Sequence, residues 1–459
     1  MGRRSVRRAG PRQVPCGDAT RWWAPLDFLV VISNRSASRL RGLVADTRPL
    51  AEPHFRRLWL ANIVTVVGAQ LTIVAVPAQI YADTGSSAYV GLTGLFGLVP
   101  LVVFGLYGGA LADVFDRRSI LRVTTLGLIV TSGLFAAQAF AGSTNVWLLL
   151  SLFAVQQAFF AVNQPTRSAV LPRLLPAEQL PAANSLQMTV FQAGAIAGPL
   201  VAGVLIPFTG YAWLYTVDTV TLGATLWAVV RLPPLPVDDG GAAKAPGLGA
   251  VVDGFAYLRT QPVLLMSFVV DIIAMVFGMP RALFPEIAHV DFGGPEAGGL
   301  AFALLFAAIP AGAVVGGVLS GWVSRVERQG LAVVVCIVVW GVAMVGFGVA
   351  VLLADLARTP MLLAAVALLA VGGAADMASA AFRSSILQSA ATDAMRGRLQ
   401  GVFIVVVAGG PRVADVAHGA SAAVVGAGAA AAGGGVLVVI GVVVAALVVP
   451  SFVRYRVTR

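Results

Sequence analysis

Charged residues are scarce in this chain. Only 11% of its 459 residues are charged, 58% are hydrophobic, and the mean hydropathy is +0.88. Apolar runs of about 20 residues recur between short polar or glycine-rich loops, which is the pattern of serial transmembrane helices. The composition therefore excludes a soluble protein and predicts an all-α, polytopic membrane protein.

The sequence also lacks the motifs of several functional classes. It contains no Walker loop, so ATP is not expected to drive it, and no His/Cys cluster with the spacing of metal ligands. Its cysteines, Cys16 and Cys336, lie far apart in the chain, which predicts neither a disulfide nor a metal site. No serine lies in a nucleophile–base pattern. We therefore expect no enzymatic activity and no cofactor.

Hydropathy predicts twelve transmembrane helices. The boundary between the last two is the hardest to place, because residues 426–435 are only glycine and alanine. The predicted spans are 57–81, 88–112, 119–141, 146–170, 180–206, 211–231, 263–287, 298–323, 330–353, 360–385, 397–424 and 434–453.

These spans divide the chain into five parts. Residues 1–50 form an arginine-rich N-terminal extension that we expect to be disordered; it either contacts anionic lipid or reflects a start codon placed too early, so that residues 1–43 fall outside the native protein. A first six-helix bundle follows over 51–232, then a cytoplasmic linker over 233–258 that is rich in proline and glycine. A second six-helix bundle over 259–455 precedes a tail over 456–459.

The formal net charge of +10 follows the predicted topology. With both termini in the cytosol, the inner loops and the C-terminal tail are rich in arginine, whereas the outer loops hold only Arg358. This asymmetry is the positive-inside rule, so the basicity reports membrane orientation and gives no reason to expect a nucleic-acid partner. We expect a multi-pass protein of the bacterial cytoplasmic membrane whose partners are lipid, protons and a small-molecule substrate, with no required protein partner.

The second half of the chain repeats the first. Three short motifs recur in the same order and at nearly the same spacing, which indicates two parallel six-helix halves. Gly108-Gly109-Ala110-Leu111 recurs as Gly316-Gly317-Val318-Leu319, Arg167-Ser168 as Arg383-Ser384, and Gly198-Pro199 as Gly410-Pro411.

The loop between the second and third spans carries the most specific motif. It reads Gly109-Ala110-Leu111-Ala112-Asp113-Val114-Phe115-Asp116-Arg117-Arg118, with small residues for close helix packing, an acid at the membrane face and paired arginines. Spacing, chemistry and position resemble the loop signature of the major facilitator superfamily. Thr166-Arg167-Ser168-Ala169 and Arg396-Gly397-Arg398-Leu399 extend the similarity to the branch of enterobactin exporters and actinobacterial multidrug efflux proteins.

The resemblance implies a conformational gate. Gly109, Asp113, Arg117 and Arg118 would form it, with Asp113 contacting the cytosolic end of the eleventh helix near residues 396–400 in one conformation. Gly321 replaces the acid in the second copy of the loop, so the gating role falls on Asp113.

The fifth span resembles the helix signature of the superfamily's antiporters. The matching residues are Gly194, Gly198, Pro199 and Gly203, although Ala202 stands where a second glycine is usual. Small residues permit tight packing and proline bends the helix, which would limit proton leakage. Plain close packing is the alternative interpretation.

Charged side chains within spans are costly and are candidates for proton coupling. We place Asp218, Asp271, Arg412, Asp415 and His418 in this group, because a carboxylate beside arginine and imidazole can change protonation as water access alternates. An internal salt-bridge network is the alternative for Asp415, and a packing contact with Thr219 or Thr221 for Asp218. Asp376 is a further acid within a span.

Polar side chains of the first half are candidates for substrate contact. Gln156, Asn163 and Arg167 share one face of the fourth span, and Gln192 of the fifth span would line the same cavity. Helix packing is the alternative role for each.

Together these features predict a secondary active transporter. The expected activity is proton-coupled efflux of a small amphipathic molecule, a siderophore or a drug, by alternating access. A proton-coupled importer and a non-transporting receptor or scaffold remain alternatives, and flux into vesicles under an imposed pH gradient would distinguish the three.

Overall fold

A computed structural model describes residues 46–235, 256–390 and 393–456, although it leaves the side chains of residues 106–114, 324, 390, 393–405 and 407–408 undescribed. The described residues form helices and no strands. The long helices are α2 (Pro53–Thr84), α3 (Ser87–Val114), α4 (Arg117–Phe140), α5 (Val146–Leu174), α6 (Leu180–Val230), α8 (Pro262–Gly278), α10 (Leu300–Val318), α11 (Gln329–Leu352), α12 (Arg358–Ala390), α13 (Asp393–Val425) and α14 (Ala427–Val448). Short helical segments are η1 (Arg48–Ala51), η2 (Ala177–Gln179), η3 (Arg281–Leu283), α9 (Phe284–Glu286), η4 (Ile287–Asp291), η5 (Ser320–Arg325) and α15 (Pro450–Val453).

Helix α6 is two spans joined at a kink. Gly210 has φ of 72° and ψ of 176°, a backbone conformation that glycine adopts at no steric cost. With α6 divided there, the described residues contain twelve long helical segments, as the hydropathy pattern predicts. Among the described residues, ten stretches are long and apolar enough to cross a membrane. This number is smaller than twelve because α6 is counted as one stretch and α13 is not included. The protein is an all-α, multi-pass membrane protein.

The seventh predicted span, 263–287, is interrupted in the structure. Helix α8 ends at Gly278, and η3, α9 and the π-helical turn η4 follow. Pro280 causes the break, because proline lacks a backbone donor and disfavours helical geometry in the residue before it. Arg281 therefore lies beyond α8, so Arg358 is not the sole arginine at that end of the molecule.

The glycine- and alanine-rich stretch 426–435 is helical rather than a loop. Gly426 has φ of 83°, and α14 starts directly after it at Ala427. Its glycines contact α11 at backbone distance: a Cβ on Gly435 would lie 2.6 Å from the carbonyl oxygen of Gly341. Close packing explains why a stretch with weak helix propensity forms a helix here.

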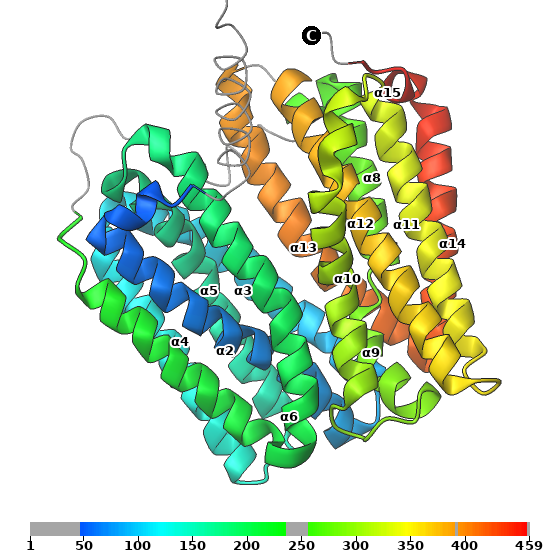
Figure 1. The fold of residues 1–459 in the computed structure, drawn as a ribbon, viewed down its shortest axis with the longest axis horizontal. Helices are drawn as coiled ribbons and strands as arrows, with labels where there is room; N and C mark the ends of the chain where they lie inside the picture. Colours follow the sequence, from blue (N-terminus) through cyan, green and yellow to red (C-terminus); the bar gives the residue numbers. More distant parts are fainter. Residues whose placement is uncertain (1–45, 236–255, 391–392, 457–459) are drawn as a thin grey trace, which may run out of the picture. The chain divides into compact units, whose positions relative to one another are not determined.

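The helices form two bundles, α2–α6 and α8–α14, which Figure 1 shows in blue to green and in yellow-green to red. Two helix pairs join the bundles: α3 packs against α13, and α6 packs against α10. In each pair, the second helix of one bundle meets the fifth helix of the other. This exchange is the arrangement expected from a duplicated six-helix unit.

The two ends of the bundles differ in charge. We call the end that is rich in arginine the basic end and the opposite end the acidic end. The acidic end holds five carboxylates and two arginines, Arg281 and Arg358. The basic end holds Arg117, Arg118, Arg122, Arg173, Arg231, Arg325 and Arg454, and the acidic end holds Asp83, Glu286, Asp291, Glu296 and Asp355.

Candidate functional site

The contact between α3 and α13 depends on three glycines of α3. A Cβ on Gly91 would lie 2.6 Å from the carbonyl oxygen of Asp415, and one on Gly94 would lie 3.0 Å from the Cβ of Asp415. A Cβ on Gly97 would lie 2.8 Å from Nη1 of Arg412. We call this contact the α3–α13 seam. Because no larger residue fits at these positions, the α13 backbone lies directly on α3 and carries its charged residues to the boundary between the bundles.

Arg412 crosses this seam. Its Nη2 donates a 3.1 Å hydrogen bond to Oε1 of Gln157 in α5, and its guanidinium carbon lies 5.3 Å from the centre of the Phe153 ring. Asp415 is one turn further along α13, within electrostatic reach of Arg412 and of Arg281. Arg412 and Asp415 are partly exposed. The seam thus combines fixed charge, an aromatic face and an amide.

The second contact between the bundles involves the predicted antiporter-like helix. Gly203 of α6 accepts a 2.7 Å backbone hydrogen bond from Gly299, and a Cβ on Gly203 would lie 2.5 Å from the Cβ of Ala303 in α10. Gly194 and Gly198 instead pack inside the first bundle, against Val66 and Gln70 of α2. Pro199 is buried beside them. The motif therefore serves close packing on both sides of α6, and its antiporter role stays a prediction.

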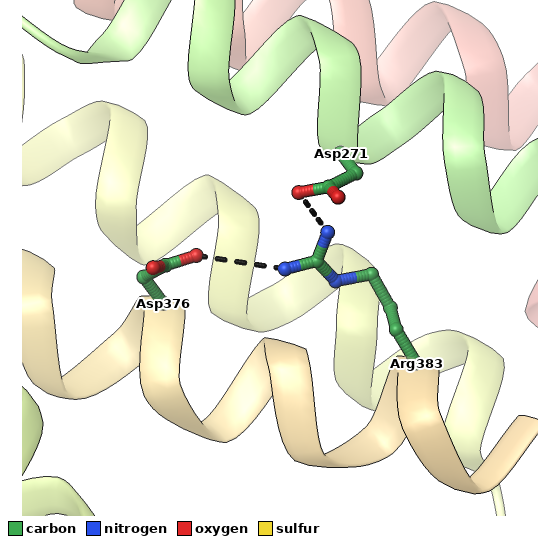
Figure 2. Close-up of polar contacts among 3 residues, drawn as sticks. All are labelled: Asp271, Asp376 and Arg383. Atoms are coloured by element: carbon green, nitrogen blue, oxygen red, sulfur yellow. Dashed lines mark ion pairs between the residues drawn. The ribbon is translucent and has the colours of Figure 1, made fainter. Parts of the chain in front are cut away.

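A buried ion-pair cluster lies in the second bundle. Arg383 of α12 forms an ion pair with Asp271 of α8. It forms a second one with Asp376, about two turns earlier on α12, at 3.6 Å between Nη2 of Arg383 and Oδ1 of Asp376. Figure 2 shows the guanidinium between the two carboxylates. Asp271 and Arg383 are 2% and 5% exposed, whereas Asp376 is 28% exposed. One cation facing two acids leaves a formal charge of −1, which a single proton on the more accessible Asp376 would neutralise.

Asp218 belongs to a polar network inside the first bundle. Its Oδ2 accepts hydrogen bonds from Thr72 at 2.8 Å and Ser132 at 2.6 Å. Thr221 bonds to the backbone oxygen of Asp218 and Thr219 to that of Tyr215, so neither satisfies the carboxylate. No basic side chain of the described residues forms an ion pair with Asp218, which makes it a buried acid held by hydroxyl groups.

The predicted substrate-contact face of α5 turns into the first bundle. Gln156 donates to Ser132 at 3.3 Å, and Asn163 donates to Thr124 at 2.8 Å, both on α4. These contacts fit the packing alternative for both amides. The neighbouring residue Gln157 is the one that reaches the seam. Arg167 and Gln192 are partly exposed, and the structure does not place either of them with Gln156 and Asn163 in these contacts to α4.

The three α13 candidates face different neighbours. His418 is buried, and its Nε2 lies 3.1 Å from the carbonyl oxygen of Phe277 near the end of α8. Arg412 instead points to α5, and Asp415 is within electrostatic reach of Arg412 and Arg281. The structure therefore does not unite Arg412, Asp415 and His418 in one hydrogen-bonded group, although helical spacing placed them on one face.

The predicted gate lies at the basic end of α3. Gly109 and Asp113 are in its last turns, where the side chains lie outside the described residues, as do those of residues 396–400. Arg118 donates a 2.5 Å hydrogen bond to the carbonyl oxygen of Val230, where Arg122 also donates, and so caps the C-terminus of α6. Arg117 follows Asp116, which caps α4 and accepts a 3.1 Å bond from the amide of Leu235.

Sequence reasoning missed Phe153, Gln157 and Arg281 and gave Arg383 no charge partner. Phe153 and Gln157 are spaced by four residues and so share a helix face, which is a signal that the sequence does contain. Nothing in the sequence marks Arg281 as lying beyond a helix except Pro280.

Comparison with known proteins identifies the family. Residues 44–454 match the family model described as transmembrane secretion effector. The chain belongs to this family of the major facilitator superfamily. It is a membrane transporter and not an enzyme.

Its relatives include exporters. The chain is 28% identical over 355 residues to the enterobactin exporter EntS of Citrobacter koseri and, equally, to that of Shigella boydii, each match covering 76% of this chain and 81% of the relative. Among solved structures, the nucleoside transporter NupG superposes with a TM-score of 0.70 at 13% identity, over 87% of this chain and 99% of the other. A bacterial homologue of the lysosomal transporter Spinster gives 0.65 at 17% identity, over 89% and 99%. These two likenesses establish the fold.

Proposed function

We propose that this transporter is a proton-coupled exporter of the bacterial cytoplasmic membrane. Its cargo is a small amphipathic molecule, a siderophore or a drug, and it works by alternating access. The single observation that carries the proposal is the pair of long-helix contacts, α3 with α13 and α6 with α10, that joins the two bundles.

These contacts suit a rocking motion. Both depend on glycine and lie in the halves of the helices nearer the acidic end, at residues such as Gly91 and Gly203. Because the backbones approach closely at these glycines, the bundles could separate there without unpacking either core. Separation would open the acidic end and require closure at the basic end, where the family resemblance places Asp113, Arg117 and Arg118.

The charge distribution supports the orientation and the relatives support the direction. Arginines gather at the basic end, so by the positive-inside rule we propose that this end faces the cytosol, together with both termini. Curated relatives bear the name enterobactin exporter, so efflux toward the acidic end is the direction we propose.

The Asp271–Arg383–Asp376 cluster supports proton coupling. A proton on Asp376 would remove its attraction to Arg383 and leave a neutral pair with Asp271, whereas its loss restores two carboxylates on one guanidinium. The ion pair between Arg383 and Asp271 links α12 to α8, so protonation of the cluster can bias how these two helices pack.

Flux measurements test the proposal. Purified protein in vesicles would be given enterobactin or ethidium under an imposed pH gradient, with protein-free vesicles as the control. We expect cargo to move against the proton flow, and Asp376→Asn to remove the dependence on the gradient. Movement with the protons would instead identify an importer, and no movement of either cargo would favour a receptor or scaffold.

A further inference from the structure

Arg412 has no carboxylate within ion-pair distance among the described residues, although it lies in the middle of a membrane-spanning helix. Its partners are the neutral Gln157 and the ring of Phe153. Arg383, in contrast, has two carboxylates. Since an uncompensated charge within the bilayer is costly and usually functional, the difference between these two arginines requires an explanation.

The surroundings of Arg412 carry excess positive charge. Arg412 and Arg281 are both within electrostatic reach of Asp415, so two guanidinium groups act on one carboxylate. Within this group the formal charges sum to +1, which an anion bound beside Arg412 would offset. A guanidinium has five N–H donors, and the bond to Gln157 uses one of them.

An apolar neighbour defines the rest of the site. Phe153 of α5 lies under the guanidinium, whose carbon is 5.3 Å from the centre of the ring. An aromatic face accepts a flat apolar body. Arg412 itself is partly exposed and so remains accessible to a ligand.

We propose that Arg412 selects the cargo, and that the cargo is an aromatic or amphipathic molecule bearing an anionic group. The anion pairs with the guanidinium in place of Gln157, while the apolar body lies against Phe153. Because Gln157 belongs to the first bundle and Arg412 to the second, cargo that displaces Gln157 also loosens the α3–α13 seam. This inference rests on the proposed transport function and names its substrate class.

Matched ligand pairs test the inference. Full-length protein in nanodiscs would be titrated with 2-naphthoate and with 2-naphthamide, which share a ring system and differ in charge, and apparent affinity would be taken from the rise in Tm. We expect the acid to bind roughly tenfold to hundredfold more tightly than the amide, the range for a hydrogen bond to a charged group. Arg412→Gln should abolish this preference and Arg412→Lys should keep part of it. Arg325→Gln, which removes an exposed arginine at the basic end, should bind as the wild type does.

Equal binding of acid and amide, binding of neither, or a preference retained in Arg412→Gln would overturn the inference. If Arg412→Gln does not fold, the wild-type pair and Arg412→Lys still decide it. The outcome is separable from the transport proposal: vesicles that export only neutral or cationic cargo contradict anion selection alone, whereas selective binding of the acid without any flux contradicts transport alone.

Discussion

The backbone amide of Gly299 donates a 2.7 Å hydrogen bond to the carbonyl oxygen of Gly203, and this bond joins the two bundles. Neither residue has a side chain that could hold the bundles apart. Contact at this point is therefore set by backbone proximity, and adding side-chain volume at Gly203 should weaken it.

Replacing Gly203 by valine should open the acidic end. Its Cβ would lie 2.5 Å from that of Ala303, and overpacking of this kind costs about 1–2 kcal/mol, which raises an open fraction roughly 5–30-fold. A cysteine at Ser87, which is 2% exposed at the same end, would report opening through its rate of labelling by an impermeant maleimide in a background lacking Cys16 and Cys336.

The matched control for Gly203→Val is Gly223→Ala in the same helix. A Cβ on Gly223 meets no atom within 4 Å, so labelling at position 87 should stay at the wild-type rate. An unchanged rate in Gly203→Val would show that the bundles are not held together at this point.

Removing the positive charge of Arg383 should destabilise the second bundle. Arg383→Gln leaves Asp271, which is 2% exposed, without its cation, and breaking a buried pair in this way costs about 3–5 kcal/mol. Thermal unfolding followed by size-exclusion chromatography would measure the loss. The double variant Asp271→Asn with Arg383→Gln should recover much of it, because the deeply buried position 271 then carries no unpaired charge and only the more exposed Asp376 is left without its cation. A double variant as unstable as the single one would contradict pairing as the cause.

Neutralising Asp376 should uncouple transport from pH. Asp376 is 28% exposed and 3.6 Å from Arg383, so it is the more accessible of the two carboxylates of the cluster. At high pH the cluster carries one excess negative charge, and uptake of a proton at lower pH removes it. Asp376→Asn fixes the neutral state, so downhill flux should continue with a flat pH profile. A variant that keeps the wild-type profile would exclude Asp376 as the coupling residue.

The sequence predicts the fold well because transmembrane helices are encoded locally. Twelve spans follow from hydropathy, and the kink at Gly210 falls between two of them. The two errors arise where packing overrides local preference. Pro280 ends α8 early, and the 426–435 stretch becomes helical because its glycines lie against α11. Composition alone cannot show that a glycine-rich segment has a close neighbour.

The candidate sites are less predictable, because they depend on how one helix is rotated against another. The internal repeat aligns Arg167 with Arg383, yet among the residues that the structure describes only Arg383 of this pair meets carboxylates. Gln156 and Gln157 are adjacent in sequence, and the structure turns one into the first bundle and the other toward Arg412. A shift of one residue on a helix is about 100°, which exceeds what polarity patterns can resolve.

Two acids, Asp113 in the last turn of α3 and Asp116 just after it, should respond differently to substitution. Asp116 caps α4 through the amide of Arg118 and holds the amide of Leu235, so Asp116→Ala should lower the free energy of unfolding by about 1–2 kcal/mol. Asp113, by family resemblance, acts in gating, so Asp113→Asn should abolish or shift transport while membrane abundance and Tm stay near wild type. Thermal unfolding and vesicle flux, measured on both variants at matched expression, separate the two roles.

Wild-type flux in Asp113→Asn would show that Asp113 has no role in gating. An unchanged Tm in Asp116→Ala would show that the helix cap and the bond to Leu235 contribute little to stability.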